Sequence, residues 1–97
     1  MAEGRAGDDV GPVLEASHAG RAVLSAIRAE NPSVSVIDRG SYLRVLVPSR
    51  CVVSRAAIER ELGREFRLPR DLESLMPSFK GLLAVTPDSV EWSFERR

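Results

Sequence analysis

Few side chains in this chain have the chemistry that a catalytic or metal site needs. His18 and Cys51 are the only imidazole and the only thiol in the sequence. A structural zinc site draws its ligands mainly from Cys and His, and nucleophilic catalysis needs a nucleophile beside a base. Ser54 precedes a helical pattern, where a serine caps the first amides of the helix. We therefore interpret Ser54 as a cap and expect no catalytic residue, no metal and no cofactor.

The lone thiol also limits how the fold is stabilised. Cys51 opens the apolar run Cys51-Val52-Val53, which favours a small buried hydrophobic residue over a reactive group. One cysteine cannot form an internal disulfide. The hydrophobic core must therefore supply the stability of this chain without covalent cross-links.

Charge and hydropathy narrow the classes of partner. Acidic and basic residues number 14 each, so no overall field attracts nucleic acid or an anionic membrane. No stretch approaches the roughly 20 apolar residues of a membrane span, and no signal peptide precedes the first helix. We expect a cytoplasmic protein with no nucleic-acid and no membrane partner. Of the basic residues, 13 are Arg, which favours planar contacts at protein interfaces but equally fits a GC-rich genome.

The elements that would position any site begin after a polar segment. Residues 1–9 lack large apolar side chains, which predicts a flexible N-terminal tail. Residues 10–14 are apolar, but Pro12 cannot donate to a ladder, which predicts an edge strand or an extended lead-in. Residues 17–30 repeat apolar side chains at helical spacing, and Asn31-Pro32 stops this first helix.

Strand patterns dominate the middle of the chain. Residues 34–37 and 42–47 flank a turn signal at residues 38–41, which predicts a hairpin. Residues 50–53 predict a third short strand. Ser54 then caps a second helix, which ends where Gly63 supplies a left-handed residue.

The last third predicts one short helix and a second hairpin. The helix spans residues 69–76, between Pro69 and Pro77. The hairpin joins residues 81–86 to residues 89–94 through a turn at Pro87-Asp88. The side chains in these segments that we predict to be buried are Leu72, Leu75, Met76, Val90, Trp92 and Phe94.

Together these elements predict an α+β fold with mixed, largely antiparallel sheets and two to three short helices packed on one side. The sequence contains no internal repeat and no low-complexity linker. We therefore predict a single domain over residues 10–97 behind the tail of residues 1–9.

The order of several short segments resembles the effector proteins, also called coupling or regulatory proteins, of bacterial multicomponent diiron monooxygenases. Each segment is common alone, but together they span nearly the whole chain in the family's order. The resemblance is strongest to the toluene and alkene monooxygenase branch, because the methane monooxygenase effector has a long N-terminal arm that this chain lacks. The segments are Val10-Gly11-Pro12-Val13, Asn31-Pro32, Asp38-Arg39, Tyr42-Leu43-Arg44-Val45, residues 58–66, Ser78-Phe79-Lys80-Gly81 and Trp92-Ser93-Phe94.

This resemblance implies a cofactor-free, non-catalytic protein that docks on a carboxylate-bridged diiron hydroxylase. Docking in the family couples electron transfer and dioxygen activation to hydroxylation or epoxidation of a hydrocarbon or aromatic substrate. An effector that prefers one hydroxylase conformation shifts the population toward it. We expect this protein to be a monomer when free, and the hydroxylase to hold the substrate.

Apolar and Arg side chains outside the core are the candidates for the partner interface, because such groups dominate binding energy. Two segments combine aromatic and small residues, and a third places two arginines beside Phe66. Core packing is an equal alternative for Tyr42 and Phe79, and a solvated face for the arginines. The candidates are Arg39, Gly40, Ser41, Tyr42, Arg64, Arg67, Ser78, Phe79, Lys80 and Gly81.

Two other functions fit the same elements. A small ligand-sensing regulatory α+β domain would bind a polar ligand and gain thermal stability from it. An RNA-binding sheet would stack bases on Trp92 and Phe94, but their alternation with polar residues favours burial. The neutral charge also removes the expected attraction to the RNA backbone.

Overall fold

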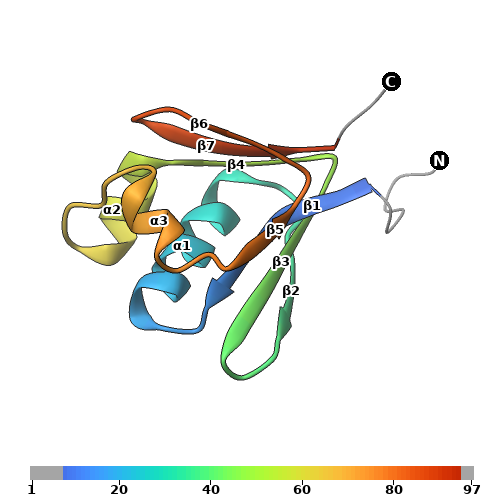
Figure 1. Cartoon of the computed structure of the whole chain (residues 1–97), viewed down its shortest axis with the longest axis horizontal. Coiled ribbons are helices and arrows are strands. Elements are labelled where there is room, and N and C mark those ends of the chain that lie inside the picture. The colour runs from blue at the N-terminus through green and yellow to red at the C-terminus, as the bar shows by residue number, and fades with distance from the viewer. Residues whose placement is uncertain (1–7, 95–97) are drawn as a thin grey trace.

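The computed structural model describes residues 8–94 of the chain. These residues form seven strands and three helices in the order βαβββααβββ, and Figure 1 shows how they are arranged. The strands are β1 (Asp9–Glu15), β2 (Ser35–Asp38), β3 (Tyr42–Pro48), β4 (Arg50–Ser54), β5 (Ser78–Lys80), β6 (Leu82–Val85) and β7 (Ser89–Ser93). The helices are α1 (His18–Glu30), α2 (Arg55–Leu62) and α3 (Arg70–Glu73).

The strands form two sheets. The large sheet has the order β2-β3-β1-β5 and the small sheet the order β4-β7-β6. Every pairing within them is antiparallel. The helices lie in the angle between the two sheets, so that each sheet has one covered face (Figure 1). The predicted α+β class, with antiparallel sheets and helices on one side, is confirmed.

Local signals in the sequence set the helix ends. The Ser17 hydroxyl accepts a hydrogen bond from the amide of Gly20 at 3.1 Å and caps α1. The Ser54 hydroxyl caps α2 in the same way through the amide of Ala57, also at 3.1 Å. Gly63 follows α2 with φ of 83°, the left-handed conformation predicted for it. The predictions for Ser54 and Gly63 are therefore confirmed.

The first strand differs from its prediction as an edge strand. β1 lies inside the large sheet, between β3 and β5. Its pairing with β3 joins Val10 to Val47 and resumes only at Val13 and Arg44. The ladder is thus interrupted at Gly11 and Pro12, where proline has no amide hydrogen to donate. This interruption lets a proline occupy a central strand.

Several boundaries also differ from prediction. Asp8 and Asp9 belong to the ordered fold, because the Ser49 amide donates to the Asp8 carbonyl at 2.9 Å and Asp9 begins β1. The rest of the predicted tail, residues 1–7, lies outside the described residues. The predicted helix over residues 69–76 reduces to α3, although Leu72, Leu75 and Met76 are buried as expected. β2 begins at Ser35, not at residue 34.

Phe94 was predicted to share the core face of Trp92, and this is wrong. β7 ends at Ser93, whose partner Arg50 is the first residue of β4. Phe94 therefore lies beyond the last cross-strand pair and is 38% exposed. Alternation continues in the sequence, but the described residues leave more than a third of this side chain exposed.

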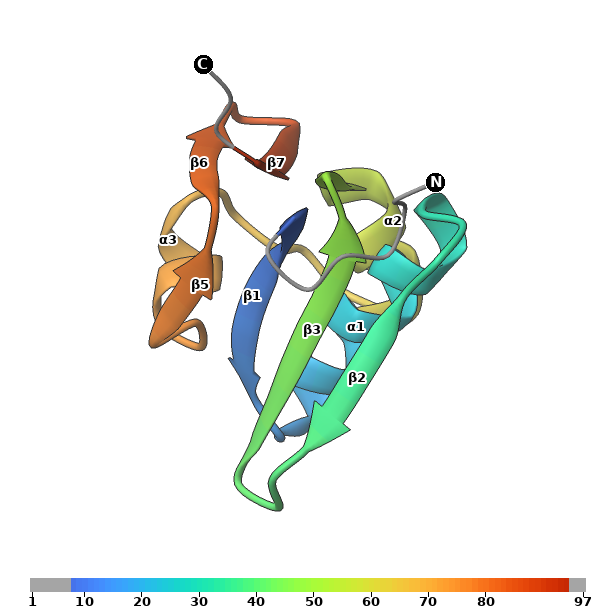
Figure 2. The same cartoon turned by 90° about the vertical axis from the view of Figure 1, so that its right-hand side faces the viewer.

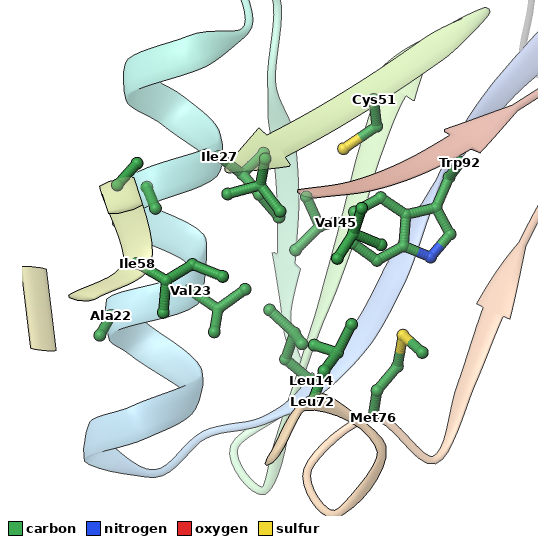
Figure 3. Close-up of a cluster of buried hydrophobic side chains, with 14 of the residues drawn as sticks. Leu14, Ala22, Val23, Ile27, Val45, Cys51, Ile58, Leu72, Met76 and Trp92 are labelled. Carbon is green, nitrogen blue, oxygen red and sulfur yellow. The ribbon is translucent and has the colours of Figure 1, made fainter. Parts of the chain in front are cut away.

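One hydrophobic core joins both sheets and the helices. Figure 3 shows Trp92 and Cys51 entering the buried cluster from the small sheet, and Val23 and Ile27 entering it from α1. Trp92 and Cys51 are fully buried, as the sequence predicted. The cluster extends from Val10 to Trp92, so the described part of the predicted domain shares a single core.

Because Cys51 is buried, the free energy of unfolding should vary with pH in the alkaline range. Burial raises the pKa of this thiol from 9.0 to about 12. Between these two values the unfolded thiol ionises while the folded thiol stays protonated, so the folded state binds more protons. The free energy of unfolding should therefore fall as pH rises above about 9, by up to about 1.4 kcal/mol per unit.

Urea titrations at about pH 8 and about pH 10 test this linkage. The wild type should lose about 1.4 kcal/mol more over this interval than Cys51→Ala, which lacks the thiol. Parallel losses in the two proteins would contradict the assignment. Comparing the two proteins cancels every pH-dependent contribution that they share.

Candidate docking surface

Within residues 8–94, no layer covers one face of the large sheet. Along β3, Leu43, Val45 and Val47 are buried toward α1. Tyr42 and Leu46 therefore point to the opposite side, because successive side chains of a strand alternate between faces. Figure 2 shows β1, β3 and β2 side by side, with α1 behind them.

Cross-strand register places one continuous row of side chains on this face. Ile37 of β2 lies opposite Arg44 of β3, and Arg44 lies opposite Val13 of β1. Val13 in turn lies opposite Ser78 of β5. The row therefore crosses all four strands. We define the open sheet face as Val13, Ile37, Tyr42, Arg44, Leu46, Ser78 and Lys80.

A groove lies on the β1 side of this face. Its volume is about 230 Å³, and its floor includes Gly11, which has no side chain. A Cβ at Gly11 would collide with the carbonyl oxygen of Val45, and φ there is +146°. Glycine at this position thus allows β1 and β3 to approach and leaves the hollow open. The groove is lined by Gly11, Val13, Arg44, Leu46, Ser78, Phe79 and Lys80.

The first predicted segment, Arg39 to Tyr42, forms the tip of the β2–β3 hairpin. The Arg39 amide donates to the Tyr42 carbonyl at 2.8 Å, and the Gly40 amide donates to Asp38 Oδ1 at 2.8 Å. The Ser41 carbonyl accepts from the Ala16 amide at 2.8 Å, which fixes the tip to the end of β1. Tyr42 is 43% exposed, so it is not a core residue.

The second candidate segment, Ser78 to Gly81, contains a strand that the sequence pattern did not predict. Ser78, Phe79 and Lys80 form β5, the edge strand beside β1. Gly81 has φ of +112° and turns the chain from the large sheet into the small one. Phe79 is 43% exposed, so it too lies outside the core.

The third predicted segment lies elsewhere. Arg64 and Arg67 are exposed in the connection between α2 and α3, while Phe66 between them is buried. The Phe66 amide donates to Glu59 Oε2 at 2.9 Å, so this residue anchors the connection. Figure 2 shows α2 in the upper half of the molecule and the tip of the β2–β3 hairpin at the bottom. The structure therefore unites the first two segments on one sheet and separates the third.

Arg44 is the arginine at the centre of the open sheet face, and it has no polar partner among the described residues. Several arginines elsewhere are paired within the chain. Arg50 Nε lies 3.0 Å from Glu91 Oε2, and this hydrogen bond raises the pKa of Arg50. Arg55 Nη2 lies 3.6 Å from Asp88 Oδ1. The Arg44 guanidinium is thus available to a carboxylate of another molecule.

Sequence reasoning missed four residues of this surface, namely Val13, Ile37, Arg44 and Leu46. The sequence of β3 does contain a signal for Leu46. Buried and outward positions alternate along this strand, and Leu46 is an apolar residue at an outward position. Tyr42 and Arg44 occupy the other outward positions of the same strand. Val13 and Ile37 join this face because of how their strands pair with β3. Alternation within a single strand does not reveal that pairing.

The described residues give no support to a catalytic or metal site. Over residues 8–94, no group of three or more His, Cys, Asp and Glu side chains is placed to hold a metal ion. The Ser54 hydroxyl accepts from Ala57 and donates to Glu30 Oε2 at 2.9 Å, so its partners are a backbone amide and a carboxylate. Trp92 is fully buried and cannot stack on a base.

The hydropathy of the helices bears on a membrane role. No helix in the described part of the chain is long and apolar enough to cross a membrane.

The geometry defines a class of protein: a small α+β domain with two antiparallel sheets, one of which has an open face among the described residues. The sequence pattern of the MmoB/DmpM family matches residues 8–93. The effector subunit of the alkene monooxygenase system of Xanthobacter autotrophicus (strain ATCC BAA-1158 / Py2) is 40% identical over 88 residues. That match covers 89% of this chain and 86% of the relative.

Solved structures share the fold. Two chains from structures of a phenol hydroxylase–regulatory protein complex match with TM-scores of 0.79 and 0.72, at 18% and 23% identity. They cover 90% and 87% of this chain, which spans 98% and 99% of theirs. The soluble methane monooxygenase regulatory protein B matches with a TM-score of 0.69 at 24% identity, over 91% of this chain and 66% of that protein.

The chain belongs to the MmoB/DmpM family. The predicted resemblance to the effectors of multicomponent monooxygenases is thereby confirmed. The protein is accordingly a regulatory component and not an enzyme.

Proposed function

We propose that this chain is the effector of a multicomponent monooxygenase, and that it binds the diiron hydroxylase of that system. The observation that carries the proposal is the 40% identity, over nearly the full length of both chains, to an alkene monooxygenase effector subunit. The open sheet face supports it, because a docking protein needs a surface that is not used by its own core.

The effector acts by selecting a conformation of the hydroxylase. A protein that binds one hydroxylase conformation more tightly than another shifts the population by its differential affinity. A coupling energy of about 1–3 kcal/mol changes that population about 5- to 150-fold. In the favoured conformation, the hydroxylase uses electrons and dioxygen to oxidise an alkene or aromatic substrate. The chain supplies binding energy and no reacting group.

The contact surface follows from the two segments that lie on the large sheet. The hairpin tip, from Arg39 to Tyr42, and β5 with Gly81 flank β1 and its groove. Arg64 and Arg67 form a separate candidate contact beyond α2. In this proposal residues 10–97 act as one effector domain, which is a cytoplasmic monomer before it binds.

Steady-state turnover tests the proposed function. The hydroxylase and its electron-transfer proteins are titrated with this chain, and NADH consumption and oxidised product are measured together. Product per NADH should rise and saturate near a stoichiometric amount of the chain. An unrelated protein of similar size is the control. A flat ratio across the titration, together with an unchanged rate, would contradict the effector role.

A further inference from the structure

We propose that the open sheet face is the surface that docks on the hydroxylase, and that Arg44 at its centre pairs with a hydroxylase carboxylate. This inference rests on the proposed function. It adds the face, the residue that dominates the contact and the chemistry of the partner surface. That surface carries a carboxylate surrounded by apolar side chains.

The first argument is composition. Interfaces derive most of their binding energy from aromatic and Arg side chains, surrounded by apolar groups that exclude water. Tyr42 and Ile37 are 43% and 40% exposed, and both border Arg44 on this face. Val13 and Leu46 add half-buried apolar surface beside them. Arg44 thus has apolar neighbours on the adjacent strands, with an aromatic side chain at one end of the face, where Glu15 lies opposite Tyr42, and with Lys80 on β5.

The second argument is charge. An arginine that enters an apolar interface without a partner loses its hydration and gains nothing in return. Arg44 has no acceptor among the described residues, so the other molecule must supply it. Carboxylate matches the planar guanidinium because both hydrogen bonds of a bidentate pair can form. The surface opposite Arg44 is therefore acidic at one point and apolar around it.

The third argument is the contrast with the small sheet, whose outer face is also uncovered. There Arg50 is already paired with Glu91 at 3.0 Å. The other outward positions of β4 and β7 include Ser54, Ser89 and Ser93. This face also has apolar outward positions, namely Val52, Leu82 and Ala84, but its arginine is already paired within the chain. It has less to gain from contact with a partner than the open sheet face.

The fourth argument is rigidity. Every strand that contributes to the open sheet face is held by backbone pairing, and the hairpin tip is fixed to β1 through Ala16 and Ser41. A surface that is already ordered loses little conformational freedom on binding, so more of its contact energy appears as affinity. The groove above Gly11 adds a concave site for a protruding side chain of the hydroxylase.

Charge reversal at Arg44 tests the proposal. Arg44→Glu would face the hydroxylase carboxylate with a like charge, and the dissociation constant of the complex should rise at least about 30-fold. Arg44→Lys keeps the charge but not the planar fork, so its effect should be smaller. Binding is measured by isothermal titration calorimetry with the hydroxylase, and circular dichroism verifies that each variant is folded.

The matched control is Arg28→Glu. Arg28 is exposed on α1, which lies on the other side of the large sheet (Figure 2). The same charge change there should leave affinity within about 3-fold of the wild type. Equal affinity of Arg44→Glu and Arg28→Glu, with wild type that binds and couples normally, would overturn the docking face alone. Wild type that neither binds nor couples would instead overturn the proposed function.

Discussion

Trp92→Ala should lower the free energy of unfolding by about 3–5 kcal/mol, the largest loss that we expect from a single truncation. Trp92 is the largest fully buried side chain, and it joins the small sheet to the common core. Removing the indole leaves a cavity that the surrounding strands cannot close, because both neighbours of β7 hold it in register. The free energy of unfolding of a native protein is only about 5–15 kcal/mol, so this substitution would remove a large fraction of it.

Urea unfolding followed by circular dichroism measures this effect, since the variant lacks the only tryptophan. Trp92→Phe is the matched control. Nε1 of Trp92 is buried without a hydrogen-bond partner among the described residues, and phenylalanine removes this unpaired donor while it keeps an aromatic ring. The Phe variant should therefore lose less than half as much as the Ala variant. A loss below about 1 kcal/mol for Trp92→Ala would contradict the assigned packing.

Gly11→Ala should cost about 2–5 kcal/mol, because two unfavourable terms add. The backbone at Gly11 has φ of +146°, which side chains rarely adopt. The new methyl group would also collide with the Val45 carbonyl of the neighbouring strand. The collision is with backbone that is held in a sheet, so no side chain can move to relieve it.

Gly40→Ala separates the two terms. Gly40 also has a positive φ, of +86°, but no atom lies within 4 Å of the position of a Cβ. This variant should cost only about 1 kcal/mol, the conformational term alone. Thermal or urea unfolding compares both variants with the wild type. Equal losses at the two glycines would show that the close approach of β1 and β3 is not a steric constraint.

Much of the fold could be predicted from the sequence because its local signals are strong. Ser17, Ser54 and Gly63 define helix ends through bonds to their own neighbours. The Asp38-Arg39-Gly40 turn fixes the first hairpin in the same way. These features depend on residues a few positions apart, and sequence patterns report such short-range interactions reliably.

The place of β1 in the large sheet could not be predicted in this way. It depends on β5, a strand of three residues that lies more than sixty positions further along the chain. So short a strand shows no alternation that separates it from a loop. Pro12 argued against a central strand, and the interruption of the β1–β3 ladder that accommodates it is a tertiary feature.

The candidate site was predicted in parts. The hairpin tip and the segment from Ser78 to Gly81 were each identified from composition, but their common sheet depends on β1 between them. Arg44 was quoted as part of a family motif and not as a contact, because its neighbours on the face come from three other strands. A surface built across strands becomes visible only when the register is known.

Side-chain footprinting tests the central claim most directly. Hydroxyl radicals would label the free chain and the chain bound to the hydroxylase, and mass spectrometry would compare Tyr42 with Leu82. Tyr42 lies on the open sheet face, whereas Leu82 lies on the outer face of the small sheet and is 53% exposed. The account predicts that binding suppresses labelling of Tyr42 and leaves Leu82 unchanged. Suppression at Leu82 with Tyr42 still labelled would contradict it.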